Sequence, residues 1–116
     1  MPLNVQNVTI SAGVVTVSTP MGAESSTGIY YVATEGGAET DDITQIQGLV
    51  DGEHEMIELR VQVDGDFWII RHNPSNGITL QQEQDFETFH ARDFIILRGI
   101  GTNAVMEVLR GRFGTL

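Results

Sequence analysis

The stretch Met56–His72, MIELRVQVDGDFWIIRH, decides the fold class. In its first half every second residue is aliphatic: Ile57, Leu59, Val61 and Val63. The residues between them are charged or amide-bearing, so one face of an extended chain is apolar and the other is polar, which is typical of a half-buried β-strand. Asp64–Gly65 interrupts this alternation, and because glycine accepts the positive φ of tight turns, it predicts a hairpin. We therefore expect Asp66–His72 to pair with Met56–Val63 as an antiparallel strand.

Shorter β-branched and aromatic runs extend from this stretch in both directions. Two lie before residue 18 and contain Val5, Val8 and Ile10, then Val15 and Val17; the others are Thr27–Thr34, Ile78–Leu80, Asp93–Arg98 and Ala104–Arg110. Residues 35–42 are acidic, contain glycine and show no periodicity, which indicates a loop. Gln81–Arg92 has only a weak apolar stripe at helical spacing. Short strands at intervals of roughly ten residues predict an all-β fold, either a small β-barrel or a β-sandwich.

The chain has 116 residues and a mass of 12.7 kDa, which is the size of one domain. We expect the barrel or sandwich to occupy residues 21–116. Residues 1–20 have two interpretations that the sequence does not separate. They form either an extended arm that adds a strand to a neighbouring molecule or an ordinary N-terminal hairpin of the domain.

Charge and composition exclude several classes of protein. Six basic residues stand against sixteen acidic ones, the net charge is −10, and every basic residue is an arginine. Nucleic-acid binding needs clustered cations, so we expect no nucleic-acid partner. The acids serve either as a solvated surface or as a contact for a basic surface, such as the arginine-bearing half of a neighbouring copy. We also expect a soluble chain, because no apolar run approaches the roughly 20 residues of a membrane helix and no leader segment is apparent.

No residue pattern predicts catalysis, a metal centre or a cofactor. The chain has no cysteine, and His54, His72 and His90 lie on separate elements without the spacing of metal ligands. Gly99-x-Gly101-x-x-Ala104 superficially resembles a dinucleotide fingerprint, but the β-rich residues after it favour a hairpin turn. We therefore predict no enzyme activity, no catalytic residue, no metal ligand and no cofactor. Calcium binding by the acidic loop of residues 35–42 is left open.

The strand around Trp68 is apolar on both faces, with Phe67 and Ile69 on one and Trp68 and Ile70 on the other. In a small domain, such a strand packs one face inside and the other against a further surface. This favours oligomerisation. The candidate subunit contacts combine this strand with the N-terminal segment: Val5, Val8, Ile10, Phe67, Trp68 and Ile69.

A resemblance to a known class of module begins near residue 43. It rests on soft motifs of glycines and alternating aliphatics: Ile43-x-x-Ile46-x-Gly48-x-x-Asp51-Gly52, Ile57-x-Leu59, Trp68–Ile70, Asn76-Gly77-Ile78-x-Leu80, Phe94–Leu97 and Val105-x-Glu107-x-x-Arg110. Over roughly residues 40–113 the chain resembles a β-rich (β-tulip-like) module of tailed-bacteriophage virion proteins, found in tail fibres and head-decoration proteins. Met106 stands where that module has a tryptophan.

The resemblance implies a homotrimeric structural protein of the virion, assembled in the cytoplasm of the bacterial host. Because the chain is small and repeat-free, we expect a capsid decoration (cement) protein that binds the major capsid protein on the outer shell and stabilises it. The candidate subunit contacts would then also be candidate capsid contacts. The alternative is a tail-fibre or spike module that binds a receptor or glycan, for which Trp68, Tyr30 and Tyr31 would supply aromatic platforms. A small enzyme is the third hypothesis.

Overall fold

The computed structural model describes residues 4–17, 27–49 and 56–111. Within these ranges the chain forms strands and three 3₁₀ turns of three residues each, and no longer helix. The strands are β1 (Asn4–Thr9), β2 (Val14–Thr16), β3 (Thr27–Ala33), β4 (Thr40–Ile43), β5 (Gln45–Gln47), β6 (Met56–Val61), β7 (Phe67–Ile70), β8 (Ile78–Thr79), β9 (Phe86–Glu87), β10 (Phe94–Gly101) and β11 (Ala104–Gly111). The 3₁₀ turns are η1 (Glu35–Gly37), η2 (Pro74–Asn76) and η3 (Gln81–Glu83).

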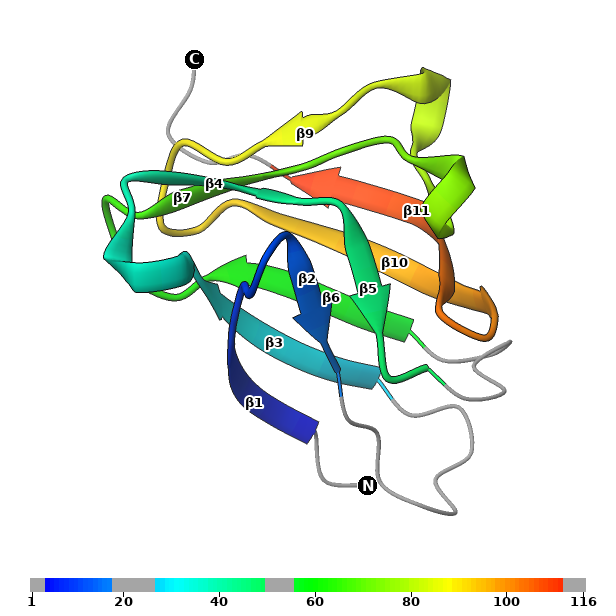
Figure 1. Ribbon diagram of the computed structural model, residues 1–116, viewed down its shortest axis with the longest axis horizontal. Coiled ribbons are helices and arrows are strands. Elements are labelled where there is room, and N and C mark those ends of the chain that lie inside the picture. The colour runs from blue at the N-terminus through cyan, green and yellow to red at the C-terminus, as the bar shows by residue number, and fades with distance from the viewer. Residues whose placement is uncertain (1–3, 18–26, 50–55, 112–116) are drawn as a thin grey trace.

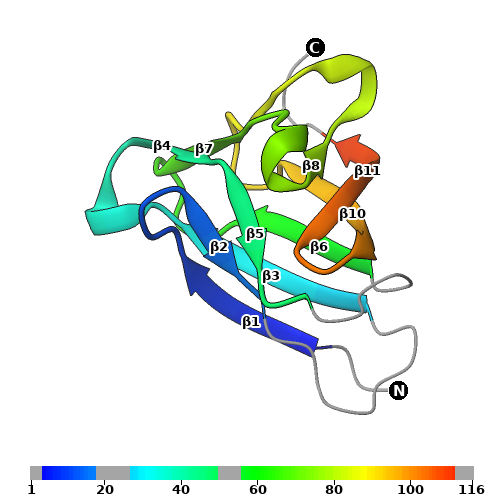
Figure 2. The same ribbon diagram turned by 45° about the vertical axis from the view of Figure 1, so that its right-hand side comes forward.

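Six strands form one sheet in the order β1-β3-β6-β10-β11-β8. A second layer contains the pair β2-β5 and the three strands β4-β7-β9, and Figures 1 and 2 show it lying over one face of the six-stranded sheet. Side chains from both layers meet in a single core. The all-β prediction is therefore confirmed.

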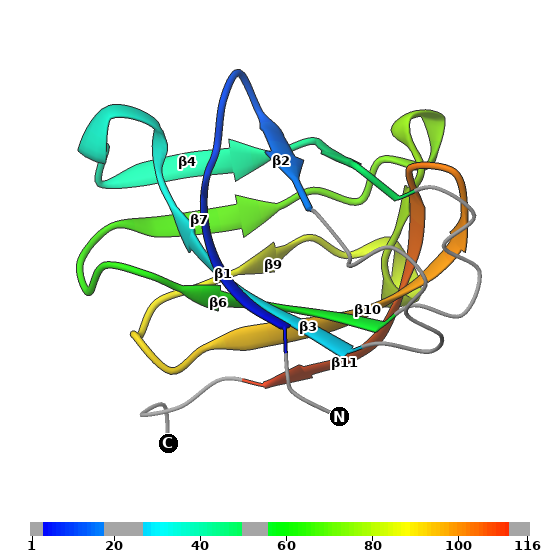
Figure 3. The ribbon, with the colours of Figure 1, turned by 90° about the horizontal axis from the view of Figure 1, so that it is seen from below.

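The first three passes of the chain stack on one another like the coils of a β-solenoid. Each pass begins in the six-stranded sheet and continues into the second layer: β1 to β2, β3 to β4 and β5, and β6 to β7. Successive passes pair in parallel, as β1 with β3, β3 with β6, β2 with β5, and β4 with β7. Figure 3 shows β4, β7 and β9 side by side. The six-stranded sheet is open, with β1 and β8 at its edges, so the barrel form of the prediction is not confirmed.

The hairpin predicted at Asp64–Gly65 is wrong. The turn exists, with the Asp66 N–H donating to the Val63 carbonyl at 3.0 Å, but it carries the chain from one layer to the other. β6 pairs with β3 and β10, whereas β7 pairs with β4 and β9. The alternation of residues showed correctly which side chains are buried. It could not show the pairing, because two strands facing one core from opposite layers have the same period of two.

The described part of the N-terminal segment belongs to the same domain. β1 adds a parallel strand to β3, and β2 adds one to β5, so β1 and β2 do not pair with each other as a hairpin. Ile10, Val15 and Val17 are completely or almost completely buried in the common core. Ser11 and Val14 bridge the turn between β1 and β2, and residues 4–17 form the first coil of the stack.

The turns predicted between the strands are present, but one predicted loop is partly a strand. The Gly99–Asn103 turn joins β10 and β11 as an antiparallel hairpin, as expected. Residues 73–77 form a turn that ends at Gly77, whose φ is +87°. The loop expected at residues 35–42 is wrong at its end, because Thr40–Ile43 pairs with β7 as β4 despite its two aspartates. Their side chains find partners at the rim of the sheet, so acidity did not prevent a strand there.

Trp68 is the largest fully buried side chain and lies at the centre of the second layer. Its ring meets Phe86 edge-on, with centroids 6.5 Å apart and an interplanar angle of 68°. Thr88, just after the two-residue strand β9, extends the pairing through its side chain. Its Oγ1 accepts from the Trp68 N–H at 3.0 Å and donates to the Trp68 carbonyl at 2.8 Å. A short strand therefore holds the backbone of the central core residue.

Gly48 fixes the stacking of the first coil on the second. Its φ is +93°, and a Cβ there would lie 1.9 Å from the Val17 carbonyl oxygen. Gly36 also has a positive φ, +65°, but has open space around it. We predict that Gly36→Ala lowers the free energy of unfolding by about 1 kcal/mol, the cost of the left-handed conformation. Gly48→Ala should cost several times more in urea unfolding, because β2 must also move away from β5. Equal losses would contradict this account.

Candidate functional site

The structure does not bring the predicted contact residues together. Ile10 and Trp68 are completely buried, so neither presents its side chain to a partner. Val8 and Phe67 are partly buried and pack against the core, and Ile69 is half-buried beside Phe67 on β7. Of the predicted contacts Val5 alone is strongly exposed, at 54%. It lies on β1 in the other layer.

A different surface carries exposed apolar side chains, namely the face of the six-stranded sheet that points away from the core, here called the outer face. The pairing register places Val5, Ile29, Glu58, Ile96 and Leu109 in one row across β1, β3, β6, β10 and β11. The next row contains Asn7, Tyr31, Arg60, Phe94 and Gly111. Their neighbours along each strand, such as Tyr30, Leu59 and Ile95, are buried on the opposite face. The sheet thus presents aliphatic and aromatic side chains on both faces.

The apolar exposure is concentrated on β10 and β11. Ile100, Met106, Val108 and Leu109 are between 43% and 53% exposed. A β-bulge opposite Ile96/Leu97 shifts the register of β11, which leaves both Val108 and Leu109 exposed. Scattered exposed aliphatics are ordinary, but adjacent ones on a sheet face are typical of a protein contact surface.

A hollow of about 480 Å³ lies within the outer face. It is lined by Tyr31, Glu58, Arg60, Ala91, Arg92, Phe94, Ile96 and Leu109. The Arg60 guanidinium pairs with Glu58, lies 5.8 Å from the centre of the Tyr31 ring and donates to the Tyr31 hydroxyl at 3.3 Å. The hydrogen bond with Glu58 raises the pKa of Arg60 against the opposing effect of burial. Arg60 is therefore a fixed cation, and its charge is balanced inside the hollow.

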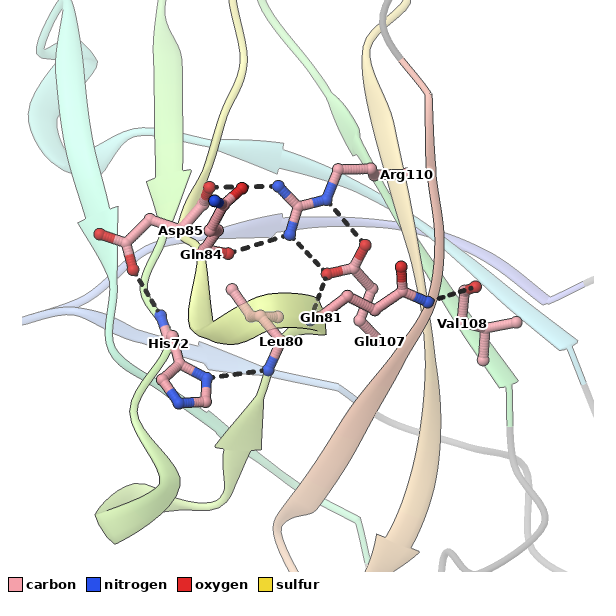
Figure 4. A network of polar contacts seen from close by, with 8 residues as sticks. All are labelled: His72, Leu80, Gln81, Gln84, Asp85, Glu107, Val108 and Arg110. Carbon is pink, nitrogen blue, oxygen red and sulfur yellow. Dashed lines mark hydrogen bonds and ion pairs between the residues drawn. The ribbon is translucent and has the colours of Figure 1, made fainter.

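A second polar cluster joins β11 to the segment after β8, as Figure 4 shows. Glu107 has a fully buried side chain and forms two bonds with Arg110, Nη2 to Oε1 at 2.5 Å and Nε to Oε2 at 2.7 Å. Its Oε1 also accepts from the Gln81 N–H at 3.0 Å. Arg110 donates further to the carbonyls of Gln84 and Asp85. The cluster fastens the 81–85 segment to the sheet.

The same segment is held from its other side by His72 and Arg71. The Asp85 carboxylate accepts from the His72 N–H at 2.7 Å and pairs with Arg71 at 3.0 Å. These contacts, led by the backbone bond, lower the pKa of Asp85. The His72 ring accepts from the Leu80 N–H through Nδ1 at 3.0 Å. Each of these groups already forms a hydrogen bond or an ion pair with another part of the chain. The cluster is therefore organised for structure rather than for proton transfer to a substrate.

The described residues contain no group of three histidine, aspartate or glutamate side chains able to hold a metal ion. His54 lies outside the described residues. In the acidic segment, Glu35 accepts from the Ala12 N–H, Asp41 from the Glu35 N–H, and Asp42 pairs with Arg71. These carboxylates bond to the protein itself. In the part of the chain that the structure describes, no helix is long and apolar enough to cross a membrane.

Comparison with known proteins adds no relative: no family model, no curated protein and no solved structure matches the chain.

Sequence reasoning missed the outer face although the sequence contained its signal. In Asp93–Arg98, DFIILR, four consecutive apolar residues place Phe94 and Ile96 on one face and Ile95 and Leu97 on the other. That is the same two-sided pattern that directed attention to the Trp68 strand. On β7 the second-face residue Phe67 packs against the core, whereas β11, which pairs with β10, leaves Met106 and Leu109 exposed.

The Glu107 cluster predicts how stability depends on pH. Burial alone would raise the pKa of Glu107, but the bonds from Arg110 and Gln81 outweigh it and hold the pKa below its ordinary value of 4.5. A carboxyl whose folded pKa is lowered stabilises the fold above its unfolded pKa, and that contribution is lost as the pH falls. We predict an unfolding midpoint in urea that falls below about pH 4.5.

Glu107→Gln should lower the free energy of unfolding at pH 7 by about 2 kcal/mol, because a charged hydrogen-bond pair is lost, and should flatten the decline in acid. Glu83→Gln is the matched control, since it is the same substitution at an exposed glutamate. If both variants behaved alike, the cluster would not have the stabilising role assigned to it.

Proposed function

We propose that this chain is a structural assembly protein of a tailed-phage virion, a homotrimeric capsid decoration (cement) protein that binds the major capsid protein. One observation carries the assembly part of the proposal: the six-stranded sheet has an exposed apolar outer face in addition to its buried one. A sheet that is apolar on both faces is stable in water when something covers its second face. The virion setting is supported by the resemblance of residues 40–113 to phage modules.

The energetics favour a closed ring over a pair. Covering the half-exposed aliphatic side chains of the outer face contributes about 1 kcal/mol for each. With about five such side chains, one contact gains roughly 5 kcal/mol, which is comparable to the lower range of the cost of bringing two molecules together. A cyclic trimer forms three contacts for two association steps, so its balance is more favourable than that of a dimer. As the fold for this role we propose a two-layered sandwich whose first coils stack in parallel.

The alternative, a tail-fibre or spike module that binds a receptor or glycan, receives less support. Trp68 and Tyr30, two of the three aromatic residues that motivated it, are completely buried. Tyr31 remains on the outer face beside Arg60 and Phe94. A single half-buried ring of this kind suits a subunit contact as well as a sugar platform.

We predict that the purified protein has a solution mass near three times 12.7 kDa by light scattering and cosediments with capsids made of the major capsid protein of the same virus. Leu109→Asp places a charge on the outer face and should leave a folded monomer that no longer cosediments. The control Ser75→Asp, on the exposed turn η2, should remain trimeric and bind. A wild-type chain that is monomeric at every concentration would overturn the proposed assembly. A trimer that does not cosediment with capsids would overturn the decoration role.

A further inference from the structure

We propose that the hollow in the outer face receives the Val63–Asp66 turn of a second copy, with Arg92 contacting the carboxylates of that turn. The proposal rests on the proposed function, because it assumes that copies of the chain assemble through this face. It adds the identity of the two surfaces that meet.

Among the described residues, Arg92 is the lining cation of the hollow for which no ion pair is formed. Of its charged lining residues, Arg60 and Glu58 pair with each other. Arg92 is exposed at the rim, and among the described residues it forms no ion pair. The floor between them is apolar, formed by Phe94, Ile96 and Leu109. A matching ligand therefore has an apolar centre and a negative charge beside it.

The Val63–Asp66 turn has these two properties. Its backbone is closed by the bond from the Asp66 N–H to the Val63 carbonyl, and Gly65 at its tip has a φ of +100° with open space around it. Val63 is 43% exposed although it is aliphatic. Asp64 and Asp66 flank the tip, and within the described residues neither forms an ion pair. The turn thus presents an apolar side chain and two carboxylates on a hydrogen-bonded backbone.

The charge of the chain favours a second copy as the partner that binds in the hollow. Each chain carries a net charge of −10, so two copies repel unless arginines of one meet acids of the other. Complementary charge selects the orientation in which surfaces meet and disfavours the others. Arg92 against Asp64 and Asp66 supplies such a pairing at the hollow in the outer face.

The positions of the two surfaces suit a ring. Arg60 on β6 lies opposite Phe94 on β10, the turn begins shortly after β6 ends, and Arg92 precedes β10 by two residues. Both surfaces therefore lie at the same end of the six-stranded sheet. A contact between the turn of one copy and the hollow of the next joins different patches, and such heterologous contacts close into rings about an axis. An axis passing this end would let three copies each offer one turn and one hollow.

A charge exchange tests the proposal by light scattering and sedimentation across a concentration series. Arg92→Asp and Asp64→Arg should each raise the concentration at which the trimer dissociates by about tenfold or more. The double variant Arg92→Asp/Asp64→Arg keeps the net charge at −10 and should return that concentration to within about threefold of wild type. Two further single variants, Arg92→Ser and Ser75→Glu, change the net charge by the same amount. Arg92→Ser should weaken the trimer, whereas Ser75→Glu should leave it intact.

The outcomes separate this contact from the proposed function. A trimer that both single charge reversals leave unaffected overturns the turn-in-hollow contact and leaves assembly standing. Single variants that weaken the trimer without recovery in the double variant also overturn it, because the two residues then act independently. A wild-type chain that is monomeric throughout overturns assembly itself. Circular dichroism of each variant establishes that a loss of trimer is not a loss of folding.

Discussion

Because β1, β3 and β6 run parallel, the chain must leave the six-stranded sheet after each of them and return over the core before the next can begin. The segments that make these crossings are β2, β4 with β5, and β7, and they pair in parallel in turn. The second layer is thus a consequence of the pairing in the first. Three local features hold this arrangement together. Gly48 lets the first coil stack closely on the second, and the bonds between Trp68 and Thr88 hold the backbone of β7. The Glu107 cluster fastens the 81–85 segment to β11.

The same constraint explains why the outer face is bare. The described crossing strands, β2, β4, β5 and β7, lie on one side of the six-stranded sheet, so they do not cover its opposite side (Figures 1 and 2). The chain nevertheless places Ile29, Phe94, Ile96 and Leu109 there. An apolar face that the described residues leave uncovered is the physical basis for proposing assembly, and it is independent of any resemblance.

Local pattern predicted the strands well and their partners poorly. The alternation in Met56–Val63 correctly identified Ile57, Leu59 and Val61 as buried, because burial on a strand depends on nearest neighbours. Pairing depends on residues far along the chain, and the antiparallel hairpin that the Asp64–Gly65 turn suggested competes with a parallel stack that shows the same alternation. Local sequence holds no signal that separates the two.

Most of the contact residues predicted from the sequence are not the ones that the fold leaves exposed. Two-sided apolarity is a sound indicator of a contact surface, and both β7 and β10 have it in sequence. Only the fold shows that Trp68 and Ile10 are enclosed while Leu109 and Met106 are exposed, because enclosure depends on which strands lie opposite. Tyr31 and Arg60, separated by 29 residues, likewise meet only through the parallel register of β3 and β6.

The central claim is that other copies of the chain cover the outer face, and thiol labelling tests it directly. The chain has no cysteine, so Leu109→Cys and Ser75→Cys each introduce a single reporter. The account predicts that maleimide reacts slowly with Cys at position 109 at high protein concentration and fast after dilution to monomer, while position 75 reacts fast throughout. Equal rates at position 109 under both conditions would show that the outer face stays open to water, and would contradict the account.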